Sequence, residues 1–447
     1  MKDILIIGAG RSATTLINYV LKKAKTHQWN VVVADANVEL AKQKVATYDQ
    51  ASAVELDIKN VERRRQLISE AEVVVSMLPA FLHIEVARDC IMLKKHLMTA
   101  SYVSKEMAEL GEQARALGLI FMGEIGLDPG LDHMSAMQKI HEIEEMGGVL
   151  TSFQSYTGGL IAPESDDNPW HYKFTWNPRN VVLSGQGVAR YLEDGVVKFV
   201  PYNRVFKNHK TTEIEGLGTY EVYANRNSLL YLKIYGLENI PSIFRGTIRH
   251  LGFCDAWNAL IRIGLTDDAF SIADSANMTY RDLTEAYIPK GELPLENRVA
   301  AFLNEEVDSP IMKKLEWAGL FSDERIELNN ASPAKILEKL LLKKWKLKPT
   351  DKDMIIMKHE FEYILNGRKE LQTSTLVMEG EDQVHTAMAK LVGLPLGIFV
   401  KLVMEGEITS TKTSIPVVKE VYEPVLKELK EYGVEFVERT FSLEAVS

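Results

Sequence analysis

The chain has 447 residues, 46% hydrophobic and 26% charged, a composition typical of a globular protein of two or three domains. Its net charge of −10 at pH 7 disfavours a nucleic-acid partner, which would need an extended basic face. The two cysteines, Cys90 and Cys254, lie far apart in the sequence, which disfavours a disulfide framework and a cysteine-based metal site. We therefore expect no bound metal.

The sequence predicts neither a signal peptide nor a membrane span. The N-terminal run MKDILIIGAG contains one lysine and an apolar stretch that is too short for the core of a signal peptide. No stretch approaches the roughly 20 consecutive apolar residues that cross a membrane. We expect a cytoplasmic protein without a membrane partner.

The first 125 residues alternate apolar strands with helical segments, beginning with a helix at 12–26. The predicted strands are 3–10, 29–36, 51–58, 71–79, 96–102 and 118–126. Strands that are apolar throughout and separated by helices are typical of a parallel sheet covered on both faces. The sequence therefore predicts an α/β protein whose N-terminal domain is a Rossmann-type, doubly wound parallel sheet.

The composition changes near residue 150, where glycine, proline and aromatic residues become frequent and short strands follow. A mainly helical stretch, a second pair of strands and an apolar helical tail come next. The predicted domains are a Rossmann domain at 1–125, a mixed-sheet α/β domain for substrate binding and dimerisation at 126–250 plus 352–384, a helical insertion at 251–351, and a C-terminal segment at 385–447 that packs back on the first domain. The apolar tail favours a homodimer.

The motif GAGRSA, residues 8–13, follows the first predicted strand and opens a helix. Gly8 permits a tight turn, Gly10 lets the backbone approach a pyrophosphate, and Ala13 allows close packing of the helix, whose N-terminus binds phosphate. Asp35 ends the second strand, where a carboxylate can accept the ribose hydroxyls of an adenosine. Together they predict a dinucleotide cofactor; the alternative is a Rossmann-like sheet that has lost its cofactor.

Asp35 also favours NAD over NADP, because its charge would repel a 2′-phosphate. NADP stays open as the alternative, since Arg11 in the phosphate loop can turn toward such a group. Residues at the same edge of the sheet should line the cofactor. The predicted cofactor-binding residues are Gly8, Gly10, Arg11, Ser12, Ala13, Asp35, Ala36, Asp57, Ile58, Ser76, Met77, Leu78, Leu127 and Pro129.

The segment GEIGLDPGLDHM, residues 123–134, ends the predicted sheet and resembles the signature of the L-glutamate-forming saccharopine dehydrogenase family. Further segments resemble the family in the same order, so that the resemblance covers the whole chain. They are SMLPAFLH (76–83), TASYVS (99–104), SYTGGLIAPE (155–164), NPWHYKFTWNPR (168–179), YANRNS (223–228), FRGTIR (244–249) and DMIIMKHEF (353–361).

The resemblance implies an oxidoreductase of lysine metabolism. Saccharopine is lysine and glutamate joined through one secondary amine, and it carries three carboxylates. A hydride moves between the nicotinamide and the carbon next to that nitrogen, and water releases L-glutamate and 2-aminoadipate semialdehyde; the reverse direction is a reductive condensation. A substrate with three carboxylates requires guanidinium groups, which bind carboxylates through two hydrogen bonds.

The resemblance also implies the residues of the site. The predicted substrate-binding residues are Ser101, Tyr102, Asp128, Trp176, Arg226, Thr247 and Arg249, and the predicted catalytic residues are Asp128 and Tyr102. The alternative for each arginine is a surface salt bridge, for Asp128 a turn or helix cap, and for Tyr102 a half-buried aromatic side chain. Asp132 is predicted to cap the helix that begins at Leu131, and Glu124 receives no role.

Two other functions remain open. A related imine-reducing enzyme, such as a carboxynorspermidine or homospermidine synthase, would need more acidic and fewer arginine residues around its polyamine substrate. A dinucleotide-binding regulatory protein without turnover would have an incomplete pocket.

Overall fold

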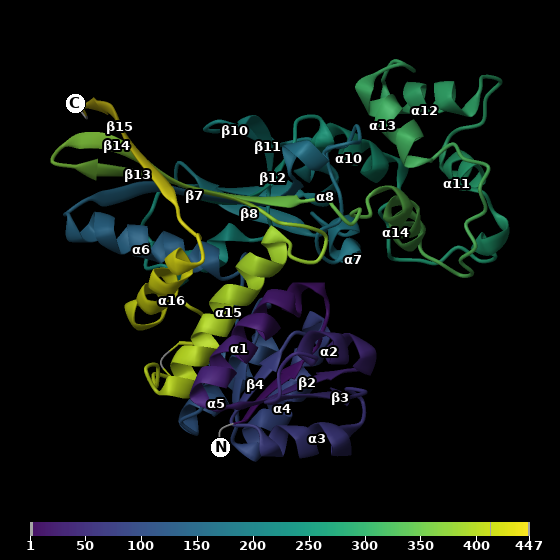
Figure 1. The fold of residues 1–447 in the computed structure, drawn as a ribbon. Coiled ribbons are helices and arrows are strands. Elements are labelled where there is room, and N and C mark those ends of the chain that lie inside the picture. The colour runs from purple at the N-terminus through teal and green to yellow at the C-terminus, as the bar shows by residue number, and fades with distance from the viewer. Residues whose placement is uncertain (1–2, 412, 446–447) are drawn as a thin grey trace.

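The structure is a computed structural model that describes residues 3–411 and 413–445 (Figure 1). The N-terminal sheet is parallel throughout, with the strand order β3-β2-β1-β4-β5-β6, which confirms the predicted Rossmann-type topology. Its strands are β1 (Asp3–Ile7), β2 (Asn30–Asp35), β3 (Ala51–Glu55), β4 (Val73–Ser76), β5 (His96–Met98) and β6 (Phe121–Met122). Its helices are α1 (Thr14–His27), α2 (Val38–Val45), α3 (Val61–Glu70), α4 (His83–Leu93) and α5 (Lys105–Ala116).

The sixth strand is shorter than the predicted run 118–126. After Met122 the backbone of Gly123 donates a hydrogen bond to the Ser414 carbonyl, and Glu124 has a φ of +52°. The chain therefore leaves the sheet at once and turns toward the second domain.

The second sheet has nine strands, in the order β10-β11-β12-β7-β13-β14-β15, with β8 and β9 as a hairpin at one side. Only β12 and β7 pair in parallel, so the predicted mixed sheet is confirmed. The strands are β7 (Val149–Ile161), β8 (Val188–Glu193), β9 (Val196–Pro201), β10 (Lys210–Ile214), β11 (Gly218–Ala224), β12 (Ser242–Arg249), β13 (Asp353–Leu365), β14 (Arg368–Glu379) and β15 (Val437–Ala445).

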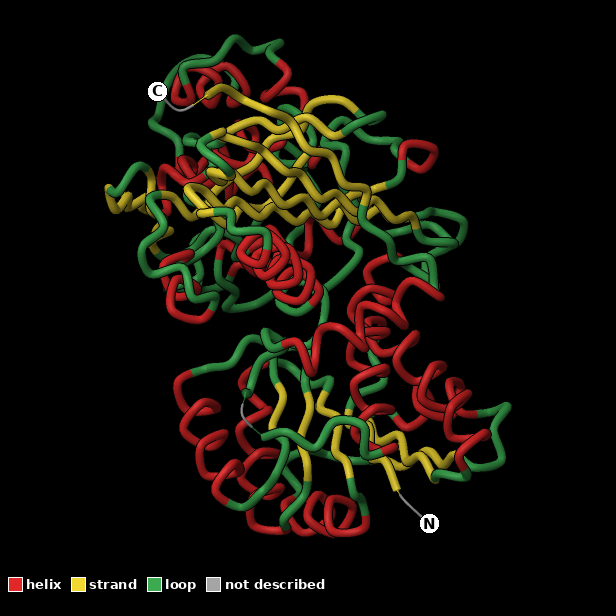
Figure 2. Tube along the Cα trace, turned by 90° about the vertical axis from the view of Figure 1, so that its left-hand side faces the viewer, coloured by secondary structure: helices red, strands yellow, loops and turns green. Residues whose placement is uncertain are grey.

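Three long helices lie beneath this sheet, on the side that faces the Rossmann domain (Figures 1 and 2). They are α6 (Leu131–Glu145), α15 (Ala387–Glu405) and α16 (Lys419–Glu431), and short helices α7 (Pro178–Val182), α8 (Tyr202–Val205) and α9 (Tyr231–Ile234) connect the strands. The helical insertion, at the upper right of Figure 1, contains α10 (Phe253–Ile263), α11 (Tyr280–Tyr287), α12 (Leu295–Leu303), α13 (Pro310–Ala318) and α14 (Pro333–Lys344).

The C-terminal segment divides between the two sheets. Helix α15 packs on α1, where a Cβ atom at Gly393 would lie only 2.6 Å from the Leu16 nitrogen, whereas β15 pairs with β14 in the second sheet. Among the described residues α15 is the one helix long and apolar enough to cross a membrane, but 78% of its apolar window is buried inside the protein. The apolar side chains of α15 thus pack inside the protein. The homodimer stays a prediction.

Candidate active site

The phosphate loop has the geometry that the motif predicts. Gly8 has a φ of +108°, and a Cβ atom there would lie 2.9 Å from the Met77 carbonyl oxygen, so a side chain is excluded. A Cβ atom at Gly10 would meet nothing within 4 Å, which leaves its backbone open to a ligand. The loop and the first turn of α1 therefore fit the pyrophosphate of a dinucleotide.

Asp35 lies beside this loop at the carboxyl end of β2. Its carboxylate accepts hydrogen bonds from the backbone N–H groups of Ala9, at 2.7 Å, and Asn37, at 2.8 Å. These two bonds fix the carboxylate at the edge of the sheet where an adenosine ribose binds.

Lys44 is a neighbour that the sequence did not single out. Its ammonium donates to the Gly10 carbonyl, at 2.7 Å, and to the Thr14 hydroxyl, at 2.8 Å. Burial lowers the pKa of Lys44 to about 8, although the charge of Asp35 opposes the shift. The cation clamps the phosphate loop to α2.

The other predicted cofactor residues follow the same edge of the sheet. Ser12, Ile58, Met77 and Leu78 are half-buried, Arg11, Ala36 and Asp57 are exposed, and Ala13, Ser76, Leu127 and Pro129 are buried. Ser76 is the one whose hydroxyl is directed elsewhere, because it hydrogen-bonds to His83 Nδ1 at 2.8 Å.

His83 connects two strand ends. Its Nε2 lies 2.8 Å from the Ser101 hydroxyl, so the imidazole bridges Ser76 at the end of β4 and Ser101 just beyond β5. Burial lowers the pKa of His83 to about 4, and the ring is neutral at pH 7. It therefore holds Ser101 by hydrogen bonds without adding charge to the site.

Tyr102 and Asp128, the two predicted catalytic residues, are in contact. The Tyr102 hydroxyl donates to Asp128 Oδ1 at 2.8 Å, and the Arg226 guanidinium lies 4.9 Å from the centre of the tyrosine ring. Burial and the neighbouring Asp128 raise the pKa of Tyr102 well above its usual value. The phenol thus stays protonated at neutral pH and acts as a donor, not as a base.

The segment 123–134 supplies three acidic groups, two of which, Asp128 and Asp132, share Arg245 as a partner. Glu124, which had no predicted role, accepts from the Val103 N–H at 2.9 Å and lies 2.9 Å from His133 Nε2. The N-cap of α6 is Gly130, so the prediction that Asp132 caps this helix is wrong. Asp132, the second residue of α6, accepts from the Gly130 N–H, and its other oxygen is an ion-pair partner of Arg245. Only Asp128 combines partial exposure with a place between the two domains.

Strand β12 presents Arg245, Thr247 and Arg249 on one face, because alternate residues of a strand point the same way. The contact between Arg245 and Asp132 of α6 shows that this face is the one directed toward the Rossmann domain. Arg245 was not among the predicted site residues, although the alternation of side chains within FRGTIR places it on the same face as Thr247 and Arg249.

Arg249 is a buried cation without a carboxylate partner among the described residues. It is 3% exposed, its guanidinium donates to the Ile248 carbonyl at 2.8 Å, and the rings of Tyr172, Tyr223 and Phe253 surround it at 5.2–5.7 Å. Its Nε makes no hydrogen bond. An unpaired buried guanidinium is costly, so the geometry calls for an anionic ligand.

Two buried hydroxyls near Arg249 also lack hydrogen-bond partners among the described residues. Thr157 pairs with Thr247 in the sheet, and Thr175 Oγ1 would lie 3.4 Å from a Cβ atom at Gly159. Within the part of the chain that the structure describes, neither the Thr157 nor the Thr175 hydroxyl has a hydrogen-bond partner, although both residues are buried. Buried polar atoms rarely remain unpaired, and these fit a polar ligand on the face of β12.

The structure thus brings Ser101, Tyr102, Asp128 and Arg226 to one end of the site, by direct contact or as chain neighbours. Thr247 and Arg249 continue from there along β12, and the half-buried Trp176 follows Thr175 in the loop beside them.

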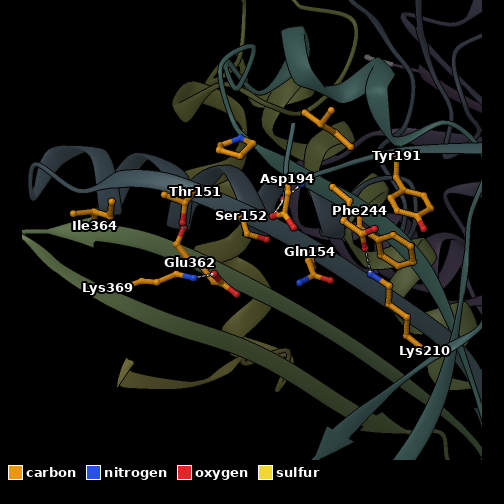
Figure 3. Close-up of a pocket in the computed structure, with 14 residues that line it drawn as sticks. Thr151, Ser152, Gln154, Tyr191, Asp194, Lys210, Phe244, Glu362, Ile364 and Lys369 are labelled. Atoms are coloured by element: carbon orange, nitrogen blue, oxygen red, sulfur yellow. Dashed lines mark hydrogen bonds and ion pairs between the residues drawn. The ribbon is translucent and has the colours of Figure 1, made fainter. Parts of the chain in front are cut away.

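A separate cavity of about 470 Å³ opens on the opposite face of the second sheet (Figure 3). Ser152 and Gln154 of β7 line it, as do Glu362 and Lys369, which form an ion pair at 2.6 Å. It contains none of the predicted site residues and belongs to a different surface.

Comparison with protein families matches residues 4–122 to the saccharopine dehydrogenase NADP binding domain and residues 126–434 to the saccharopine dehydrogenase C-terminal domain. The chain belongs to the saccharopine dehydrogenase family. The resemblance inferred from the sequence segments is therefore confirmed.

Named members of the family agree with this assignment. The chain is 31% identical to saccharopine dehydrogenase (NADP(+), L-glutamate-forming) of Saccharomyces cerevisiae, over 98% of this chain and 99% of that protein. It matches the apo structure of saccharopine dehydrogenase (L-Glu forming) from the same yeast with a TM-score of 0.87 and 30% identity, over 99% of this chain and 100% of that chain.

Longer proteins of the family also match. The chain is 33% identical to mitochondrial alpha-aminoadipic semialdehyde synthase of Mus musculus, over 97% of this chain, but it spans 47% of that protein. It spans 44% of the alpha-aminoadipic semialdehyde synthase of Arabidopsis thaliana, to which it is 31% identical over 98% of this chain.

Proposed function

We propose that the protein oxidises saccharopine, with a nicotinamide dinucleotide and water, to L-glutamate and 2-aminoadipate 6-semialdehyde, or runs the reverse condensation. The observation that carries the proposal is the buried Arg249, which has no carboxylate partner among the described residues and lies on the face of β12 from which Arg245 contacts Asp128 of the Asp128–Tyr102 pair. A ligand that spans both must be anionic at one end and cationic along its length. Saccharopine meets this requirement with three carboxylates and a secondary ammonium.

The charged residues of the site bind different groups of the substrate. Arg249 and Arg226 bind substrate carboxylates, since neither has a carboxylate partner among the described residues. Asp128 binds the secondary ammonium. This nitrogen gives up one proton to solvent before the hydride leaves, and Asp128 then stabilises the positive charge that returns to nitrogen in the protonated imine. Tyr102 orients Asp128 through its hydrogen bond.

The phosphate loop and Asp35 would hold the dinucleotide, and the open space at Gly10 fits its pyrophosphate. A bound nicotinamide would supply the hydride acceptor, and the hydride would come from the lysine-derived carbon beside the secondary nitrogen. Water then adds to the imine, the C–N bond breaks, and glutamate leaves with the nitrogen.

We propose NAD as the cofactor, although residues 4–122 match an NADP binding domain and the yeast relative is named for NADP(+). The Asp35 carboxylate is fixed by two backbone N–H groups and cannot turn away from an adenosine 2′-phosphate. Lys44 is already bound to the phosphate loop, which leaves Arg11 as the exposed cation. The charge nearest the 2′-position is therefore negative.

Replacing Asp35 tests the cofactor preference. For Asp35→Ser we expect kcat/KM for NAD to fall about tenfold and the NAD/NADP ratio of kcat/KM to drop by about two orders of magnitude, since repulsion of the phosphate is lost. Asp49→Ser, in the exposed turn before β3 and outside the predicted cofactor site, serves as the control and should leave the ratio unchanged. An unchanged ratio in Asp35→Ser would remove Asp35 from the ribose site.

A substrate panel separates the proposed reaction from its alternatives. Purified protein is mixed with NAD or NADP and with saccharopine, carboxynorspermidine or homospermidine, and absorbance is followed at 340 nm. Saccharopine alone should give a signal, because a polyamine offers too few carboxylates for the arginines. A signal with a polyamine, or none with any substrate, would contradict the proposal.

A further inference from the structure

Arg245 has a different place in the site from the other two arginines, an inference that rests on the proposed function. It shares the face of β12 with Thr247 and Arg249. Three arginines and three substrate carboxylates would suggest one guanidinium for each carboxylate. The contacts of Arg245 argue against that assignment.

Arg245 already has two carboxylate partners. Its Nη2 lies 2.8 Å from Asp128 Oδ1 and 2.5 Å from Asp132 Oδ2, and its guanidinium is 4.3 Å from the centre of the Tyr231 ring. The residue is 6% exposed. A third carboxylate would be repelled by the two aspartates, whereas an ammonium would be attracted.

The contacts hold Asp128 by one oxygen. Oδ1 receives the Tyr102 hydroxyl and the Arg245 guanidinium. Over residues 3–411 and 413–445, no group donates to Asp128 Oδ2, which is therefore available to a ligand. The side chain is 15% exposed, so Oδ2 is the part that can face the space between the domains.

The geometry points to Arg245 as a positioning residue: together with Tyr102 it fixes Asp128 Oδ1, so that Oδ2 meets the secondary ammonium of the substrate, and it binds no substrate carboxylate. Its charge also allows two aspartates to share one buried site. Burial opposes this charge, but Tyr102 and the two aspartates outweigh it and raise the pKa of Arg245 well above its usual value. The cation is therefore permanent.

The pH profile of Arg245→Met tests this role. Without the guanidinium, Asp128 and Asp132 remain as like charges that have lost their shared cation, which raises the pH needed to ionise them both. His133, whose Nδ1 lies 3.6 Å from Asp132 Oδ2, is the other titratable group in contact with this pair. We expect the acidic limb of kcat/KM for saccharopine to move up by at least about one pH unit, with NADH affinity unchanged. In Arg245→Met/Asp132→Asn the second carboxylate is gone, and the limb should return toward the wild-type position.

Further variants separate positioning from packing and from substrate binding. Arg245→Lys keeps the positive charge, so the acidic limb of kcat/KM should stay at its wild-type pH while kcat falls about tenfold. This variant tests the positioning role if Arg245→Met does not fold. Arg262→Met, which loses a guanidinium bound only to backbone carbonyls in the helical insertion, should change neither kcat nor the profile. Thermal unfolding and NADH fluorescence report on the fold of each variant.

Two outcomes would overturn the inference. A higher KM for saccharopine at every pH, with an unmoved acidic limb, would make Arg245 a carboxylate ligand. An equal loss at every pH that Asp132→Asn does not relieve would make it a packing residue. A wild-type protein that does not oxidise saccharopine would instead overturn the proposed function, so the two failures are distinguishable.

Discussion

Arg249→Met should strongly impair the use of saccharopine and at the same time make the free protein more stable. The substitution removes a charge-assisted contact to a substrate carboxylate, and we expect kcat/KM to fall by about 100- to 1,000-fold, mainly through KM, with little change for the dinucleotide. The guanidinium has no carboxylate partner among the described residues, so its loss also relieves an unpaired buried charge. The melting temperature should therefore rise by a few degrees.

The combination of the two effects is diagnostic. Arg262→Met is the matched control, because its guanidinium also contacts backbone carbonyls but lies away from the site, and it should gain no stability and lose no activity. If Arg249→Met retained activity within threefold of wild type, or were less stable than wild type, Arg249 would be a structural residue and the substrate would bind elsewhere.

Asp128→Asn should give the second large loss. The amide keeps the shape of the carboxylate but not the charge that holds the secondary ammonium, and we expect kcat/KM for saccharopine to fall by about 1,000-fold, or roughly 4 kcal/mol. Steady-state kinetics and NADH titration by fluorescence would show whether the loss is confined to the amino-acid substrate.

A control with the same chemical change is available outside the site. Asp382 accepts two backbone N–H groups on an exposed turn before α15, and Asp382→Asn should leave kcat/KM unchanged. Retention of more than a tenth of the activity in Asp128→Asn would show that the carboxylate does not carry the substrate charge.

Local patterns predicted much of the fold. The apolar strands of the first domain and the GAGRSA loop depend on residues close in sequence, and the structure forms them as expected. Strand β6 is shorter than predicted because Gly123 hydrogen-bonds to Ser414, a distant residue that the periodicity of a local segment does not reveal. The C-terminal segment was also only partly predicted, because its positions depend on distant partners: β15 pairs with β14, and α15 packs on α1.

The site shows the same division. Tyr102, Asp128 and Arg226 lie in segments that resemble the family, and the structure brings them together. Arg245 and His83 act through partners far away in the chain: Asp128 and Asp132 for the first, Ser101 for the second. These contacts are visible in the three-dimensional structure, but the spacing of residues in the sequence does not predict them.

The stoichiometry of the products tests the central claim most directly. Purified protein is incubated with saccharopine and NAD, NADH is measured by absorbance at 340 nm, and free L-glutamate is quantified in the same sample by mass spectrometry. We expect one glutamate for each NADH formed. NADH without glutamate, or no reduced cofactor with either NAD or NADP, would contradict the proposed function.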